Sequence, residues 1–171
     1  MTTTAAPRTK LVAPRTKLAA QATKEEARKT IAQVQARLKK SHATRGLGFK
    51  VESVAVGVVV FRMRVRQRHR QMHGVVHGGI LATLADTVAA VAAFSTLAPG
   101  SAIATIEMKI NFLEAVSEGN LRAEGRVLRT GRNFLVAECE IRNEDGSLAA
   151  KALLTFGAVS DRVSARLKKR E

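Results

Sequence analysis

The chain lacks tryptophan and tyrosine and contains a single cysteine, Cys139. One cysteine cannot form a disulfide within the chain, and this usage is typical of a protein from a reducing compartment. Cys139 lies in the alternating run AECEI, so we interpret it as a packing residue rather than a nucleophile. With 46% hydrophobic residues and only six phenylalanines, the 171-residue chain can form one core built mainly from Ala, Val, Leu and Ile.

Long hydrophobic runs are also absent. No apolar run reaches the roughly 18 residues that a membrane-spanning helix needs. The longest run, from Ile80 to Leu97, is interrupted by Asp86 and by threonine and serine residues. The first residues lack the apolar segment of a secretory signal peptide. We therefore expect a cytoplasmic protein with no membrane partner.

Acidic residues are scarce in the first part of the chain, where much of the net charge of +15 lies. The segment APRTKL occurs at residues 6–11 and again at residues 13–18, which is too short a repeat for a solenoid. We expect residues 1–23 to form a disordered basic tail and residues 161–171 a second basic tail. Such charge favours nucleic acid, anionic lipid or phosphorylated ligands without choosing among them. A basic, acid-poor N-terminus also resembles an organellar transit peptide.

The remaining pattern predicts one α+β domain at residues 24–160. A short amphipathic helix is expected at residues 24–40, and a long apolar helix from Gly78 to about Leu97, before Pro99 and Gly100. Strands are expected at residues 49–56, 58–70, 103–113, 120–130, 133–143 and 148–159. Short links such as the turn EDGS indicate hairpins and an antiparallel sheet. We expect this sheet of about six strands to curl around the single long helix.

Five arginines alternate with other residues in the second predicted strand. They are Arg62, Arg64, Arg66, Arg68 and Arg70. A period of two places all five on one face of a strand. We interpret this face as the solvated side of a half-buried sheet, and a groove for phosphates is the alternative.

The stretch HGVVHGGILATLADT, residues 73–87, carries the clearest chemical signal. Gly78 and Gly79 stand where the helix begins, and its free N–H groups and positive dipole end suit an oxygen that becomes negative. A tight entry turn explains the two glycines equally well. Asp86 lies on the same helix face as Gly79, among small side chains, where partial desolvation suits a general base or nucleophile. Alternatively, Asp86 is a structural acid held by a hydroxyl such as that of Thr83 or Thr87, or by a subunit contact.

The spacing of these residues bears on oligomeric state. Asp86 lies seven positions after Gly79, which is about 10.5 Å along the helix axis. A base and an oxyanion donor must each come within roughly 3 Å of one reacting group. Asp86 and Gly78 of one chain are therefore too far apart to share a small carbonyl. If both are catalytic, they come from different copies, which predicts a homodimer with two equivalent interface sites.

Other catalytic motifs are weak. His73 and His77 have helical i, i+4 spacing but lack the glutamate of HExxH, and no cysteine pair or acidic cluster supports a metal site. Ser95 lies outside any GxSxG context. No phosphate-binding P-loop or GxGxxG motif is present. We therefore expect no metal.

The run QMHGVVHGGILATLAD resembles the signature of hot-dog-fold acyl-CoA thioesterases of the phenylacetate-degradation and 4-hydroxybenzoyl-CoA thioesterase type. That signature is Asn or Gln, two residues, Gly, two residues, His-Gly-Gly, and an acid nine residues after the His. The matching positions are Gln71, Gly74, His77, Gly78, Gly79 and Asp86. The resemblance extends from about Gly48 to Val159 and includes the segments ATIEMKINFLEAV and RTGRNFLVAECEIRNEDG.

This resemblance implies a long helix wrapped by an antiparallel sheet, dimers that often pair into tetramers, and hydrolysis of coenzyme A thioesters without a cofactor. By analogy, the Gly78 N–H polarises the thioester carbonyl, and His77 supports the site by hydrogen bonding. Asp86 of the partner chain acts as nucleophile or as general base on water. Gln71 would position the carbonyl or the water, and Thr105 matches a position where some members use a hydroxyl to orient the water.

Two positions depart from the pattern. Gln71 stands where many members have Asn, and Ala90 stands where some carry a hydroxyl one turn after the acid, so that Thr105 is a candidate replacement. Because coenzyme A carries phosphates, a basic rim is also expected. Its candidates, besides part of the arginine stripe, are Gly79, Arg129, Gly131, Arg132 and Asn133.

An acyl-CoA thioesterase is thus the leading interpretation. The main alternative is a non-catalytic hot-dog protein that binds acyl-CoA, or one whose basic arm associates with nucleic acid. The acid at position 86 speaks against that alternative. A dehydratase on the same fold is a third interpretation, but its usual His–Asp motif is not seen. The acyl group and the choice between dimer and tetramer do not follow from the sequence.

Overall fold

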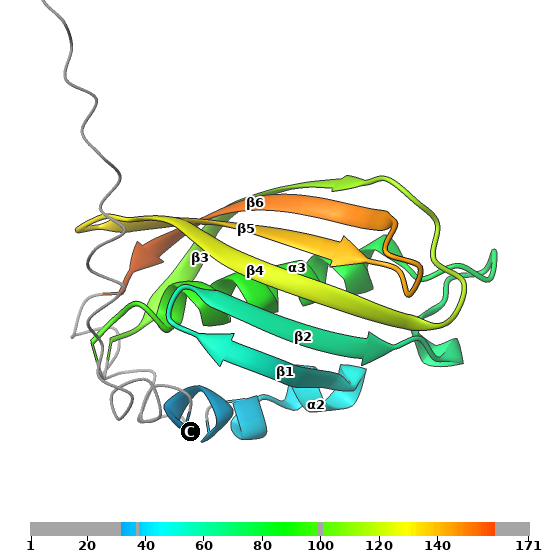
Figure 1. Ribbon diagram of the computed structural model, residues 1–171, viewed down its shortest axis with the longest axis horizontal. Helices are drawn as coiled ribbons and strands as arrows, with labels where there is room; N and C mark the ends of the chain where they lie inside the picture. Colours follow the sequence, from blue (N-terminus) through cyan, green and yellow to red (C-terminus); the bar gives the residue numbers. More distant parts are fainter. Residues whose placement is uncertain (1–31, 37, 99–100, 160–171) are drawn as a thin grey trace, which may run out of the picture.

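The computed structural model describes residues 32–36, 38–98 and 101–159 (Figure 1). The two predicted basic tails lie outside the described residues, as does the first part of the helix predicted at residues 24–40. Residues 32–36 and 38–40 of that prediction are helical. No helix among the described residues is long and apolar enough to cross a membrane.

The fold is α+β, as predicted. Its elements are α2 (His42–Leu47), β1 (Phe49–Ala55), β2 (Val58–Arg64), the short 3-10 helix η1 (Gln67–His69), α3 (Gly78–Phe94), β3 (Ile103–Phe112), β4 (Asn120–Thr130), β5 (Phe134–Arg142) and β6 (Leu148–Ala158). The six strands form one sheet in the order β1-β2-β4-β5-β6-β3, and every adjacent pair is antiparallel. Figure 1 shows this sheet curving around α3.

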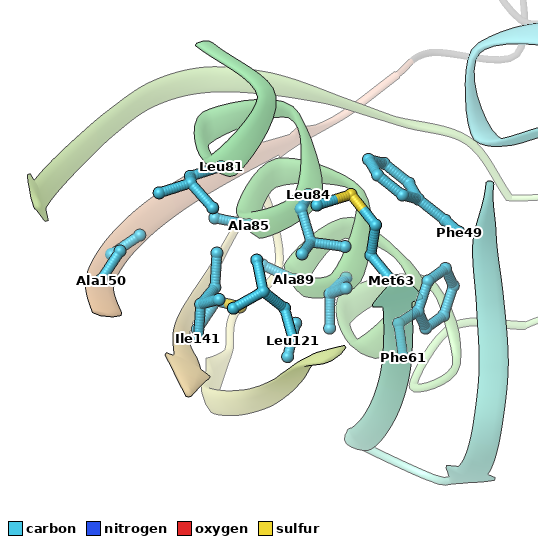
Figure 2. Packing of buried hydrophobic residues seen from close by; sticks show 14 of the residues in the cluster. Phe49, Phe61, Met63, Leu81, Leu84, Ala85, Ala89, Leu121, Ile141 and Ala150 are labelled. Atoms are coloured by element: carbon cyan, nitrogen blue, oxygen red, sulfur yellow. The ribbon is translucent and has the colours of Figure 1, made fainter. Parts of the chain in front are cut away.

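The core lies between α3 and the concave face of the sheet (Figure 2). Leu84 and Val88 on α3 are fully buried, and so are Phe61, Leu121 and Ile141 on the sheet. Burial of one such side chain contributes roughly 1.5–3 kcal/mol. The core residues of α3 are Leu81, Leu84, Ala85, Val88, Ala89, Ala92 and Ala93.

Small residues set how closely the sheet approaches the helix. A Cβ atom at Gly125 of β4 would lie 2.8 Å from the carbonyl oxygen of Val88, so only glycine fits at this crossing. Alanines at positions 85, 89 and 92 of α3 are also buried. Close packing of this face leaves the opposite stripe of α3, which includes Asp86 and Ala90, half-buried.

The outer face of the sheet carries ion pairs. Arg62 pairs with Glu52, Arg122 with Glu124, and Lys151 with Glu138 and Glu140. The Arg62 guanidinium lowers the pKa of Glu52 through a hydrogen bond. Exposed pairs of this kind contribute little to stability. Arg62 is therefore exposed on the outer face of the sheet, as expected for the solvated side of a half-buried sheet.

β2 ends at Arg64, so the predicted strand to residue 70 is wrong in its last part. β4 supplies no partner beyond this point, because its first residue, Asn120, already pairs with Arg64. η1 follows, and the ring of buried His69 holds it by accepting a hydrogen bond at Nδ1 from the Arg66 N–H (3.0 Å). The last three arginines of the stripe therefore lie in and around η1 rather than on the face of the sheet.

Cys139 and Ser95, for which the sequence predicts no catalytic role, are both buried. Cys139 is fully buried, and burial raises the pKa of its thiol to about 12, so it is held in the unreactive protonated form. Ser95 is buried at the end of α3, where its Oγ accepts a hydrogen bond from the Gly57 N–H (2.8 Å) and donates to the Ala92 carbonyl (2.7 Å). Ser95 thus ties the β1–β2 turn to the helix.

His69 predicts a pH dependence of stability. Burial, and then the charge of Arg68, lowers the pKa of His69 below its ordinary value of 6.5. As the pH falls through that ordinary value, the unfolded chain takes up a proton that the folded chain resists, so the free energy of unfolding should decrease. Urea unfolding from pH 8 to pH 5 should show a smaller decrease for His69→Gln. His73→Gln, which changes an exposed histidine, should retain the wild-type profile.

Candidate active site at the start and middle of α3

His77 caps the start of α3. Its Nδ1 accepts a hydrogen bond from the Gly79 N–H at 2.9 Å, and its carbonyl accepts one from the Ile80 N–H at 2.8 Å. The residue itself has extended backbone, as an N-cap requires. Because Nδ1 accepts, the proton of the neutral ring resides on Nε2. His77 therefore shapes the helix start, and its supporting role in the reaction stays a prediction.

The N–H groups of the two glycines are used differently. The Gly79 N–H is committed to His77, whereas the Gly78 N–H has no acceptor among the residues that the structure describes. Gly78 is the first residue of α3, where a backbone N–H has no partner within the helix. The Gly78 N–H is thus available as an oxyanion donor. Gly79 offers no such donor.

Both glycines also have packing reasons to be glycine. A Cβ at Gly78 would lie 3.2 Å from the ring of Phe112 at the end of β3. A Cβ at Gly79 would lie 3.0 Å from Nδ1 of His77. These contacts support the tight helix entry, and the donor role of the Gly78 N–H stays a prediction. The contact with Phe112 could not be foreseen, because it joins residues far apart in the chain.

Asp86 is half-buried in the middle of α3, and its partner comes from β3. Its Oδ1 accepts a hydrogen bond from Oγ1 of Thr105 at 2.8 Å. Thr83 and Thr87 do not hold it, because their hydroxyls donate to carbonyls one turn earlier in the helix. Within the described residues, Oδ2 of Asp86 has no hydrogen-bond partner and the carboxylate forms no ion pair. The structure thus brings Asp86 and Thr105 together and leaves one carboxylate oxygen uncommitted.

Gln71 lies in the tight loop that leads to α3. Its Oε1 accepts a hydrogen bond from the His73 N–H at 2.6 Å, so the amide NH₂ is the end that remains to donate. Gly74 closes the loop with a φ of +81° and donates its N–H to the Gln71 carbonyl at 2.9 Å. A hollow of about 410 Å³ opens on this loop, and its lining includes Gln71 and Arg70.

The predicted basic turn lies elsewhere. Thr130 donates a hydrogen bond to Thr96 at 3.4 Å, which places the β4–β5 turn beside the C-terminal end of α3. Gly78 is at the opposite end of that helix. The structure therefore does not bring the candidates in this turn to Gly78 within one protomer: Arg129, Gly131, Arg132 and Asn133. The charged side chains in the segment leading to the helix start are instead the exposed Arg66, Arg68 and Arg70.

Gly78 and Asp86 remain apart within one protomer. Asp86 lies eight positions after Gly78, which is about 12 Å along the helix axis. This agrees with the spacing argument from the sequence. No cluster of three or more His, Cys, Asp or Glu side chains suited to a metal ion occurs in the described part of the chain.

Residues 73–150 match the family model described as Thioesterase superfamily. A conserved protein of known structure from Pseudomonas aeruginosa is 35% identical, over 70% of this chain and 94% of that one, with a TM-score of 0.67. The PaaI protein from the phenylacetic acid degradation operon of E. coli is 26% identical, over 78% of this chain and 96% of that one, with a TM-score of 0.73.

An esterase candidate from Saccharolobus solfataricus is 42% identical over 62 residues, which are 36% of this chain. The aligned part spans 44% of that relative, less than half of its length. The antiparallel sheet curled around one long helix, together with these similarities, identifies a protein of the hot-dog thioesterase class. The chain belongs to the thioesterase superfamily.

The cap on α3 yields a prediction about stability. His77→Ala removes the acceptor for the Gly79 N–H and should lower the free energy of unfolding by about 1 kcal/mol. His77→Asn supplies a side-chain oxygen at the N-cap and should recover most of this loss. Urea unfolding at pH 8 measures both variants. Equal stability of His77→Ala and wild type would contradict the capping role.

Proposed function

We propose that this protein hydrolyses acyl-CoA thioesters to the free acid and coenzyme A. The observation that carries the proposal is that two groups on α3 have no hydrogen-bond partner among the described residues: the Gly78 N–H at the start of the helix and one oxygen of Asp86 in its middle. The first is suited to a carbonyl oxygen that gains negative charge, and the second to a nucleophile or a general base. Membership in the thioesterase superfamily supports this chemistry.

In the proposed reaction, the thioester oxygen accepts a hydrogen bond from the Gly78 N–H of one protomer. The free oxygen of Asp86 from the other protomer attacks the carbonyl carbon, or it removes a proton from a water that attacks. The carbon–sulfur bond then breaks, and the thiolate of coenzyme A leaves and takes up a proton. In the nucleophilic route, water then cleaves the bond between the acyl carbon and the Asp86 oxygen, which releases the acid and restores the carboxylate. In the general-base route, the attacking water supplies the second oxygen of the acid directly. Thr105 holds the other oxygen of Asp86 and so directs the carboxylate. The NH₂ group of Gln71 is the candidate donor to the carbonyl or the water.

The exposed edge of β3 supports a dimer that completes this site. β3 is the last strand of the sheet, and Ile106, Phe112 and Leu113 in and after it are more than half exposed. Such an edge is a template for pairing with another chain. Thr105, near one end of β3, contacts Asp86, whereas Phe112 at the other end lies against Gly78.

Antiparallel pairing of β3 with its copy therefore brings the Asp86 end of one protomer to the Gly78 end of the other. A two-fold axis produces two such sites. The basic rim for the phosphates of coenzyme A would come from Arg129 and Arg132, which remain predicted contacts, and from the arginines around η1. The proposed chemistry places no step on a metal or cofactor.

Thiol release from a panel of acyl-CoAs tests the role of Asp86. Asp86→Asn keeps the size of the side chain and its acceptor for Thr105 but removes the nucleophile or base. We expect at least about a hundredfold loss of kcat. Retained activity in Asp86→Asn would contradict the mechanism. Absence of turnover by the wild type with every acyl-CoA would favour a non-catalytic binding protein.

A heterodimer tests the sharing of the site between protomers. Gly78→Pro removes the N–H at a helix position where proline is tolerated, and Gly78→Ala is the control that adds a Cβ but keeps the N–H. A purified heterodimer of Asp86→Asn with Gly78→Pro should regain about half of wild-type activity, because one of its two sites is intact. An inactive heterodimer would show that both groups act within one protomer.

A further inference from the structure

A cavity of about 310 Å³ adjoins Asp86, and one of its two walls comes from a part of the chain that the family match does not include. One wall is the half-buried stripe of α3 with Asp86, Ala90 and Phe94. The other wall is the N-terminal segment, defined as residues 32–36 and 38–47. Its contributors are Val34, Leu38, Ser41 and Thr44. Figure 1 shows the helices of this segment, in blue and cyan, below β1.

The polar atoms in these walls are already hydrogen-bonded. Thr44 donates to Oγ of Ser41 at 2.8 Å, and Ser41 also accepts from the Thr44 N–H at 3.2 Å. Thr87 donates to the Thr83 carbonyl at 2.7 Å. The uncommitted acceptor that the lining presents is the second oxygen of Asp86. A ligand group inside the cavity would therefore meet apolar side chains, hydroxyls that are already hydrogen-bonded and one carboxylate, a lining that disfavours an anionic group.

We propose that this cavity binds the acyl group and that the N-terminal segment determines which acyl groups are hydrolysed. This inference rests on the proposed function. Asp86 lies in the lining of the cavity, so the carbonyl carbon of a bound thioester reaches its free oxygen while the acyl chain extends between Ala90 and Leu38. The favoured substrates are uncharged, compact acyl groups, because an apolar cavity of about 150 Å³ already accommodates benzene. This cavity has about twice that volume.

Ala90 leaves the space that the acyl group needs. A larger side chain at this position projects into the cavity from α3, and a smaller one at Leu38 enlarges it from the opposite wall. Loss of room for a methylene in such a pocket changes specificity by about tenfold or more. The two substitutions should therefore shift the preferred acyl length in opposite directions, which general destabilisation would not do.

The experiment measures kcat/KM by thiol release with acetyl-, hexanoyl-, decanoyl-, benzoyl- and succinyl-CoA. Wild type should prefer hexanoyl- and benzoyl-CoA to succinyl-CoA. Ala90→Leu should lower the hexanoyl-to-acetyl ratio by about tenfold, and Leu38→Ala should raise the decanoyl-to-hexanoyl ratio severalfold. Ala82→Leu and Leu47→Ala make the same changes at half-buried positions outside the lining and should leave the ratios within about twofold. Thermal unfolding confirms that each variant is folded.

Unchanged ratios in Ala90→Leu and Leu38→Ala, with wild type active, would overturn the acyl-site proposal and leave the proposed function intact. If wild type hydrolyses none of the thioesters, the proposed function fails, and calorimetric binding of hexanoyl-CoA tests the cavity by itself. Binding that Ala90→Leu weakens by about tenfold would support the site. Equal binding by wild type and Ala90→Leu, or no binding to wild type, would overturn it.

Discussion

Packing of α3 into the concave face of the sheet is the constraint on which the rest of this structure depends. Gly125 of β4 admits the backbone of the helix at Val88, and the small buried residues of α3 keep the two layers close. Because that face is filled by the core, Asp86 lies on the opposite stripe. The same packing extends β3 alongside the helix, where Thr105 reaches the carboxylate.

The two ends of the candidate site are held by different kinds of interaction. At the start of α3, contacts between neighbouring residues are enough to form the site. The His77 ring accepts the N–H of Gly79, two residues later, and the Gly78 N–H has no acceptor among the described residues. In the middle of α3, the partner of the acid comes from a strand formed nineteen residues later. Because the two groups are far apart along the helix, the proposed reaction requires two protomers. The exposed edge of β3 offers a surface on which two protomers can pair.

Much of the fold follows from the pattern of the chain. The period-two runs and the EDGS turn predicted the four strands after α3 to within two residues at each end, because each strand is a long alternating run and turn residues stand between them. The second strand was predicted too long. Its Arg alternation continues, but a strand needs a partner, and β4 has no residue to pair beyond Arg64. Local pattern cannot report where a distant strand begins.

The sequence by itself determined the class of the fold, the helix start at His77–Gly78–Gly79 and the separation of Gly78 from Asp86, since these depend on periodicity, capping and helical rise. Tertiary structure alone decided that Thr105 rather than Thr83 holds the acid and that Phe112 covers Gly78. It also decided that the N-terminal segment closes a cavity beside Asp86, and that the β4–β5 turn lies at the far end of α3. These are contacts between segments far apart in the chain, and they depend on how the sheet curves rather than on any local spacing.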